Sequence, residues 1–224
     1  MKKDNILSTI AEEETETEDV AEKVIRIPEL LPEVLAGIDS ANPRIRFGSA
    51  KILRIISGKK PEILYSKMGF FVNLLDSKNN ILKWNALDII ANLTLVDSRN
   101  EFSRLFKKFC GYLYEGNLIT ACHVVDNSGK IAVAKPELQD EITKELLKVE
   151  RIPLPTSECR NILIGKTINA FQIYFNGIKD KDEVVSFVRR HLNNPRNATK
   201  TKAHKFLEKL EKQQQRRQKP QRKL

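Results

Sequence analysis

Gly165-Lys166-Thr167 is the segment of this sequence that comes nearest to a catalytic motif, because it ends as phosphate-binding loops do. That motif, G-x-x-x-x-G-K-[ST], requires an earlier glycine at the position where this chain has Arg160. The segment also lies within an apolar helical run and does not follow a strand. Ser128-Gly129-Lys130 fails as well, since Ile131 follows the lysine. The sequence therefore does not predict nucleotide binding.

The cysteines and histidines also lack the spacing that catalysis or metal binding needs. The cysteines share no C-x-x-C motif, which is typical of free buried thiols in a reducing compartment. The histidines lie far apart, whereas a structural zinc site needs clustered ligands. No Ser or Cys has a context that predicts an activating base. The cysteines are Cys110, Cys122 and Cys159, and the histidines are His123, His191 and His204. We therefore expect no enzyme activity, no cofactor and no metal.

The charge of the chain is strongly uneven. The 224 residues carry a net charge of +10, but residues 1–40 hold 4 basic and 11 acidic groups, a net charge of −7. Residues 193–224 hold 11 basic and 2 acidic groups, a net charge of +9. A basic tail favours nucleic acid, an anionic surface or an acidic protein as partner. No apolar run reaches the ~18 residues of a membrane span, and the N-terminus does not resemble a signal peptide, so we expect a cytoplasmic protein.

Two stretches of the chain repeat each other at an offset of 37 residues. Residues 38–47 align with residues 75–84, and the match continues to Ile56 over Leu93. The apolar positions in both copies step by 4, 3, 1 and 3, which marks one face of a helix. One slot of that face holds a small residue in both copies, Ser49 or Ala86, which would let two helices approach closely. Self-similarity at this period predicts stacked helical repeats.

The whole chain divides into five predicted helix pairs and two flanking segments. The pairs are 29–38 with 43–57, 61–76 with 80–95, 98–114 with 117–133, 136–150 with 157–176, and 181–193 with 196–214. Prolines fall at predicted helix starts, and the side chains available as N-caps or turn formers are Asp39, Ser40, Asp76, Ser77 and Ser98. The acidic residues 1–24 and the basic residues 213–224 hold almost nothing to bury, so we predict that both are disordered around a repeat domain of residues 25–212.

The inter-helix turn resembles that of the HEAT family within the armadillo-like superfamily. The first copy has Asp39, Asn42-Pro43-Arg44-Ile45-Arg46 and Ala50, which match the pattern D-x-x-x-P-x-V-R and the run that follows it. The second copy keeps Asp76 and Leu82, and has Lys83 in the arginine slot. The resemblance covers about residues 28–210. It implies an all-α, right-handed α-α superhelix of about five helix pairs, and a scaffold that binds partners along a groove lined by the second helices.

Cationic and aromatic residues recur together at the starts of the second helices. Arg46 is equivalent to Lys83, and Phe47 is equivalent to Trp84. One interpretation is structural: the cations pair with Asp39, Asp76 or a carbonyl of a neighbouring repeat unit, and the aromatic rings pack between repeats. The other is a binding surface for an anion, a base or a partner's side chain. The candidate surface consists of Arg44, Arg46, Phe47, Lys51, Arg54, Lys83, Trp84 and Asp88.

These features support three hypotheses about function. The first is a non-catalytic scaffold that binds another protein through its repeat surface. The second is nucleic-acid binding through the basic face and the tail residues Arg216, Arg217, Lys219, Arg222 and Lys223, although this tail has a rival partner in the chain's own acidic run at residues 12–19. The third, on fold analogy alone, is a HEAT-like DNA glycosylase for alkylated bases with Trp84 and Asp88 at its site.

Overall fold

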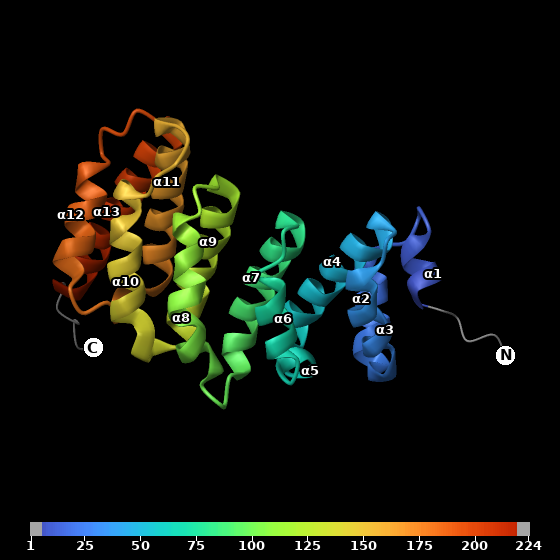
Figure 1. Ribbon diagram of the computed structural model, residues 1–224. Coiled ribbons are helices and arrows are strands. Elements are labelled where there is room, and N and C mark those ends of the chain that lie inside the picture. Colours follow the sequence, from blue (N-terminus) through green and yellow to red (C-terminus); the bar gives the residue numbers. More distant parts are fainter. Residues whose placement is uncertain (1–5, 219–224) are drawn as a thin grey trace, which may run out of the picture. The chain divides into compact units, whose positions relative to one another are not determined.

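The computed structural model describes residues 6–218, and all regular elements among them are helices (Figure 1). The chain divides into two compact units, Met1–Leu105 and Phe106–Leu224, with the division inside α8 (Glu101–Gly111). Unit 1 contains α1 (Ile6–Ala11), α2 (Thr17–Arg26), η1 (Pro28–Leu30), α3 (Leu31–Ala36), η2 (Gly37–Asp39), α4 (Pro43–Lys59), α5 (Pro61–Tyr65), α6 (Met68–Leu74), α7 (Asn80–Leu93) and η3 (Thr94–Val96).

Unit 2 continues the alternation of first and second helices. It contains the second part of α8, η4 (Tyr112–Tyr114), α9 (Leu118–Ala134), η5 (Pro136–Leu138), α10 (Gln139–Leu147), η6 (Lys148–Arg151), α11 (Ser157–Tyr174), η7 (Phe175–Gly177), α12 (Lys181–Arg190) and α13 (Asn197–Gln218). The second helices α9, α11 and α13 pack side by side in that order, as α4 and α7 do in unit 1. The five predicted helix pairs are therefore confirmed as all-α repeats.

Asparagine side chains cap three of the second helices. Asn42, Asn79 and Asn117 each accept a hydrogen bond from a backbone N–H in the first turn of the helix that follows. The predicted caps Ser40 and Ser77 instead form the preceding turn, where each hydroxyl accepts from the backbone N–H of the capping asparagine. The turns of the first two repeats are thus marked by a serine and an asparagine two residues apart, and of these the prediction named only the serine as a cap.

The predicted apolar face forms the core between helices. Ile52, Leu53 and Ile56 on α4 are fully buried, as are Ile89, Ile90 and Leu93 on α7. The small-residue slot also behaves as expected, because a Cβ added to Gly37 would lie 2.2 Å from the Oγ of Ser49. Glycine in η2 and serine in α4 therefore let the two elements of the first pair meet closely.

The prediction that residues 1–24 are disordered is wrong for residues 6–24. These residues form α1 and most of α2, which pack on α4. The reason is apolar: Val20 and Val24 on α2 and Ile6 and Ile10 on α1 are at most 4 % exposed. The acidic side chains of residues 12–19, after α1 and in the first turn of α2, are exposed. Helix α2 therefore packs on α4 as the second helix of a preceding repeat would, ahead of the five predicted pairs.

The predicted disorder of the C-terminal tail is also wrong in part. Helix α13 continues through residues 213–218 to Gln218, so Arg216 and Arg217 belong to its last turn. Lys219, Arg222 and Lys223 lie outside the described residues, and the prediction of disorder for residues 219–224 is not tested there.

Candidate interaction surface

Within each unit, ion pairs join neighbouring second helices across about one repeat length. In unit 1, Lys51 on α4 lies 3.8 Å from Glu18 on α2, and Lys59 pairs with Glu22 of the same helix. On the other side of α4, Arg54 Nη1 lies 3.4 Å from the carboxylate of Asp88 on α7. Hydrogen-bonded charged partners on neighbouring helices in both units are 34 to 40 residues apart in sequence. The surface of unit 1 therefore alternates acidic, basic and acidic groups from α2 to α7.

The remaining cations of the first repeat are also engaged. Arg44 Nε donates to the backbone oxygen of Glu12 at 3.1 Å, so the loop after α1 covers the start of α4. Arg46 donates from Nη1 to the carbonyl of Ser40 at 2.9 Å, and its guanidinium lies 4.8 Å from the centre of the Phe47 ring. Arg46 thus binds the turn before its own helix: its partner is the Ser40 carbonyl of the same repeat, whereas Asp39, Asp76 or a carbonyl of a neighbouring repeat was expected.

All eight residues of the candidate surface lie on two helices that pack together, α4 and α7. Phe47 and Trp84 are half-buried at equivalent positions, as their alignment predicts. Lys83 is also half-buried, and both Lys83 and Trp84 make further contacts within the protein. The eight residues thus come from two neighbouring helices, and their role as a binding surface stays a prediction. The prediction did not foresee that carboxylates of α2 and α7 would neutralise the cations of α4.

The Trp84–Asp88 pair gives no support to the glycosylase hypothesis. The Asp88 side chain is 16 % exposed, and its carboxylate is held by Arg54. A carboxylate bound in this way is a structural partner between repeats. We therefore assign Asp88 to the ion pair between α4 and α7 and no step of base excision to it.

The sequence predicts that the three cysteines of unit 2 are free and buried, and burial is found for only one of them. Cys110, Cys122 and Cys159 are free cysteines, and Cys110 is buried. Burial raises the pKa of the Cys110 thiol to about 12 and that of Cys122 to about 11, so both remain protonated at neutral pH. Within residues 6–218 we find no cluster of three metal-ligating side chains, and no helix there is long and apolar enough to cross a membrane.

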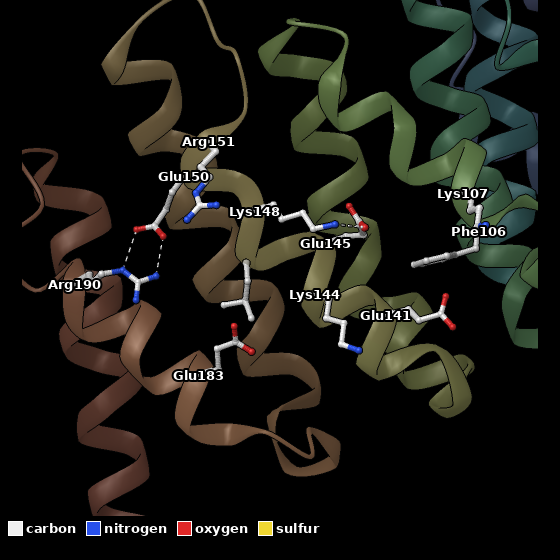
Figure 2. A pocket seen from close by; sticks show the side chains of 11 residues that line it. Phe106, Lys107, Glu141, Lys144, Glu145, Lys148, Glu150, Arg151, Glu183 and Arg190 are labelled. Carbon is white, nitrogen blue, oxygen red and sulfur yellow. Dashed lines mark hydrogen bonds and ion pairs between the residues drawn. The ribbon is translucent and has the colours of Figure 1, made fainter.

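A pocket of about 530 Å³ opens on the first helices of unit 2 (Figure 2). Its walls come from α8, α10, η6 and α12 and carry five cationic and four carboxylate side chains. Two pairs neutralise each other within it: Lys148 with Glu145, and Arg190 with Glu150, each at 2.7 Å. A lining of mixed charge, four of whose nine charged groups pair with one another, offers hydrogen bonds to a ligand but neither a nucleophile nor a metal site.

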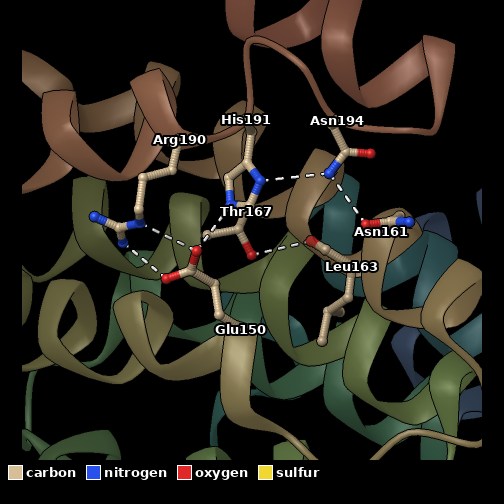
Figure 3. A network of polar contacts seen from close by, with 7 residues as sticks. All are labelled: Glu150, Asn161, Leu163, Thr167, Arg190, His191 and Asn194. Atoms are coloured by element: carbon tan, nitrogen blue, oxygen red, sulfur yellow. Dashed lines mark hydrogen bonds and ion pairs between the residues drawn. The ribbon is translucent and has the colours of Figure 1, made fainter.

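A polar network connects the last two repeats of unit 2 (Figure 3). Arg190 donates two hydrogen bonds to the carboxylate of Glu150, from Nε at 3.2 Å and from Nη2 at 2.7 Å. His191 Nε2 lies 3.1 Å from the same carboxylate, and the other ring nitrogen lies 3.3 Å from the side-chain amide of Asn194. That amide also donates to Oδ1 of Asn161 at 3.0 Å. The network fixes the turn between α12 and α13 against the preceding repeat.

The protonation of this network follows from its burial. Removal of His191 from water lowers the pKa of the imidazole, although the charge of Glu150 opposes the shift. Burial acts to raise the pKa of Glu150, but the hydrogen bonds and the charge of Arg190 prevail and hold it below its ordinary value. At neutral pH the network therefore contains a neutral imidazole beside a paired carboxylate. The sequence does not predict this network, because Glu150 and Arg190 lie 40 residues apart and no motif connects them.

Similarity to known proteins lies in the fold. No family model matches the chain, and no curated protein matches it. A designed armadillo repeat protein superposes with a TM-score of 0.55 at 16 % identity, over 91 % of this chain and 90 % of that one. An engineered protein of known crystal structure gives a TM-score of 0.52 at 12 % identity, over 93 % of this chain and 97 % of that one. This chain therefore has an all-α helical repeat fold of the armadillo/HEAT-like kind.

Proposed function

We propose that this protein is a non-catalytic interaction module that binds another protein through the surface of α4 and α7 in unit 1. The observation that carries the proposal is the pair of equivalent, half-buried aromatic residues Phe47 and Trp84 on neighbouring second helices. Repeat folds present such surfaces because each repeat buries its core against its neighbours and leaves one side of the second helices available.

The chemistry of this surface suits a protein partner better than a polyanion. Aromatic and arginine side chains supply most of the binding energy in protein interfaces, and they act where the surrounding groups exclude water. Around Phe47 and Trp84 the cations Lys51 and Arg54 are already paired with Glu18 and Asp88. A phosphate backbone would have to displace those carboxylates. A protein segment would keep them as a polar rim around the two rings.

Affinity capture from the source cell tests the proposal. The bait is the full chain, and the matched variant carries Phe47→Ala and Trp84→Ala. The control is Leu95→Ala in η3, which removes a side chain that is 64 % exposed and lies outside the candidate surface. Each variant is first shown by circular dichroism to keep its helices and its unfolding midpoint.

We expect protein partners that survive nuclease treatment, that are retained by the Leu95 control, and that are lost on removal of the two rings. Partners that disappear with nuclease favour nucleic-acid binding. Partners that bind the double variant as well as the unmodified chain contradict the assignment to α4 and α7.

A further inference from the structure

Helix α13 presents a stripe of four lysines, two of which form no ion pair with a carboxylate of the described residues. Lys202, Lys205, Lys209 and Lys212 are separated by 3, 4 and 3 residues, the spacing that aligns side chains along one face of a helix. At 1.5 Å per residue the stripe is about 15 Å long. A groove of about 320 Å³ runs beside it and is lined by Lys205, Glu208, Lys209, Lys212 and Gln213.

The charge of this lysine stripe is poorly neutralised. Among the residues that the structure describes, Lys205 and Lys209 form no ion pair, and Lys212 pairs with Glu208 of the same helix. The stem of Lys202 lies over Gly165 of α11, close to Lys166. Burial lowers the pKa of Lys202, and the charge of Lys166 lowers it further, whereas Asp126, the ion-pair partner of Lys166, opposes the shift. The lysines of α4, by contrast, have carboxylates of the preceding helix beside them.

The absence of apolar groups around the stripe argues against a protein partner. In the described part of α12 and α13 no large hydrophobic side chain is exposed. Protein interfaces need a buried apolar centre, and an exposed ion pair contributes only about 0–1 kcal/mol. Nucleic acid differs, because each neutralised phosphate releases a condensed counterion, so that charge alone provides affinity.

The same helices argue for a duplex over a single strand. Phe187 and Phe206, the aromatic rings of α12 and α13 apart from histidine, are at most 2 % exposed and are unable to stack on a base. Single-strand binding depends on such stacking. A duplex carries one charge per ~1.7 Å, so about nine phosphates lie within the length of the stripe. We infer that the lysine stripe of α13 is a sequence-independent binding site for the phosphate backbone of a double-stranded nucleic acid.

Fluorescence anisotropy with a labelled duplex tests this second function, which is independent of the protein-binding surface of unit 1. The full chain is compared with a variant that carries Lys→Gln at residues 202, 205, 209 and 212. The matched control carries Lys67→Gln, Lys78→Gln, Lys107→Gln and Lys130→Gln, which remove the same charge from exposed positions outside α13. Duplex DNA, duplex RNA, a single strand of equal length and polyglutamate are titrated at several salt concentrations.

We expect the slope of log affinity against log salt to shrink by about 3.6 in the stripe variant, from four contacts at ~0.9 each. Those contacts alone weaken binding about 150-fold between ~50 and ~200 mM salt. The control should change the slope by less than about one unit. If the loss of Lys202 unfolds the protein, the exposed pair Lys205→Gln and Lys209→Gln should still reduce the slope by about 1.8.

Three outcomes would overturn the inference. The first is an equal loss of slope in the stripe variant and the control. The second is tighter binding of the single strand than of either duplex. The third is unchanged duplex binding in a stripe variant that has lost binding to polyglutamate, which would assign the stripe to an acidic protein.

Discussion

Helix α2 should be held in place by its apolar side chains and not by its charges. Val24 of α2 is fully buried, and α2 packs on α4. Val24→Ala deletes two buried carbons, and we expect this change to cost about 2 kcal/mol, given ~0.5–1.5 kcal/mol for each methylene lost from a core. The ion pair of Glu22 with Lys59 joins side chains that are 45 % and 46 % exposed. Glu22→Gln should therefore cost clearly less than Val24→Ala, because water screens an exposed ion pair.

Hydrogen exchange of the α2 amides measures both changes in one assay. Local opening of α2 governs this exchange, and a change of ~1.4 kcal/mol in the opening free energy is tenfold in rate. Val24→Ala should accelerate exchange by about 30-fold, and Glu22→Gln by clearly less. High salt should behave like Glu22→Gln because it screens the same pair. Exchange in α2 that responds more to salt than to Val24→Ala would show that charge holds the helix, and would refute this reasoning.

Two further predictions concern buried polar groups. Ser49→Ala should stabilise the protein by about 1 kcal/mol in urea unfolding. The buried Ser49 hydroxyl has no hydrogen-bond partner among the described residues, and alanine already occupies the equivalent position 86 in the next repeat. A loss of stability would show that the hydroxyl is hydrogen-bonded. His191 has a lowered folded pKa, so the unfolded chain binds protons first and stability is lost as the pH falls below the ordinary value of 6.5. His191→Gln should reduce the difference in unfolding free energy between about pH 7.5 and 5.5. The stability that Glu150 contributes is lost only below the ordinary carboxyl pKa of 4.5, outside this range. An undiminished difference would exclude His191 as its source.

The repeat helices were predictable because each follows from local information. Periodic apolar residues such as Ile52, Ile56, Ile89 and Leu93 define the buried face without reference to any distant residue. The 37-residue offset then shows that two such faces are equivalent and must stack. The predicted second helices begin within two residues of the observed ones for the same reason, since a proline or a capping side chain precedes each apolar run.

The N-terminal helices escaped prediction because their stability is tertiary. The run from Glu12 to Asp19 has the composition of a disordered segment, and composition does not show that α4 offers an apolar surface to α1 and α2. A local signal did exist, since Ile6 and Ile10, and Val20 and Val24, are each four residues apart. Such short apolar pairs predict helices only when the apolar surface of α4 on which they pack is known.

Position in the repeat array decides what a lysine does in this protein. Lys51 and Lys59 on α4 have an acidic helix on one side, and the repeat length brings Glu18 and Glu22 into range, so their charge is used within the fold. Lys205 and Lys209 on α13 belong to the same residue class, yet neither forms an ion pair with a described carboxylate. Net charge alone therefore does not locate a binding surface in a helical repeat. The informative quantity is the charge left over after neighbouring repeats have paired, and that remainder is small on α4 and large on α13.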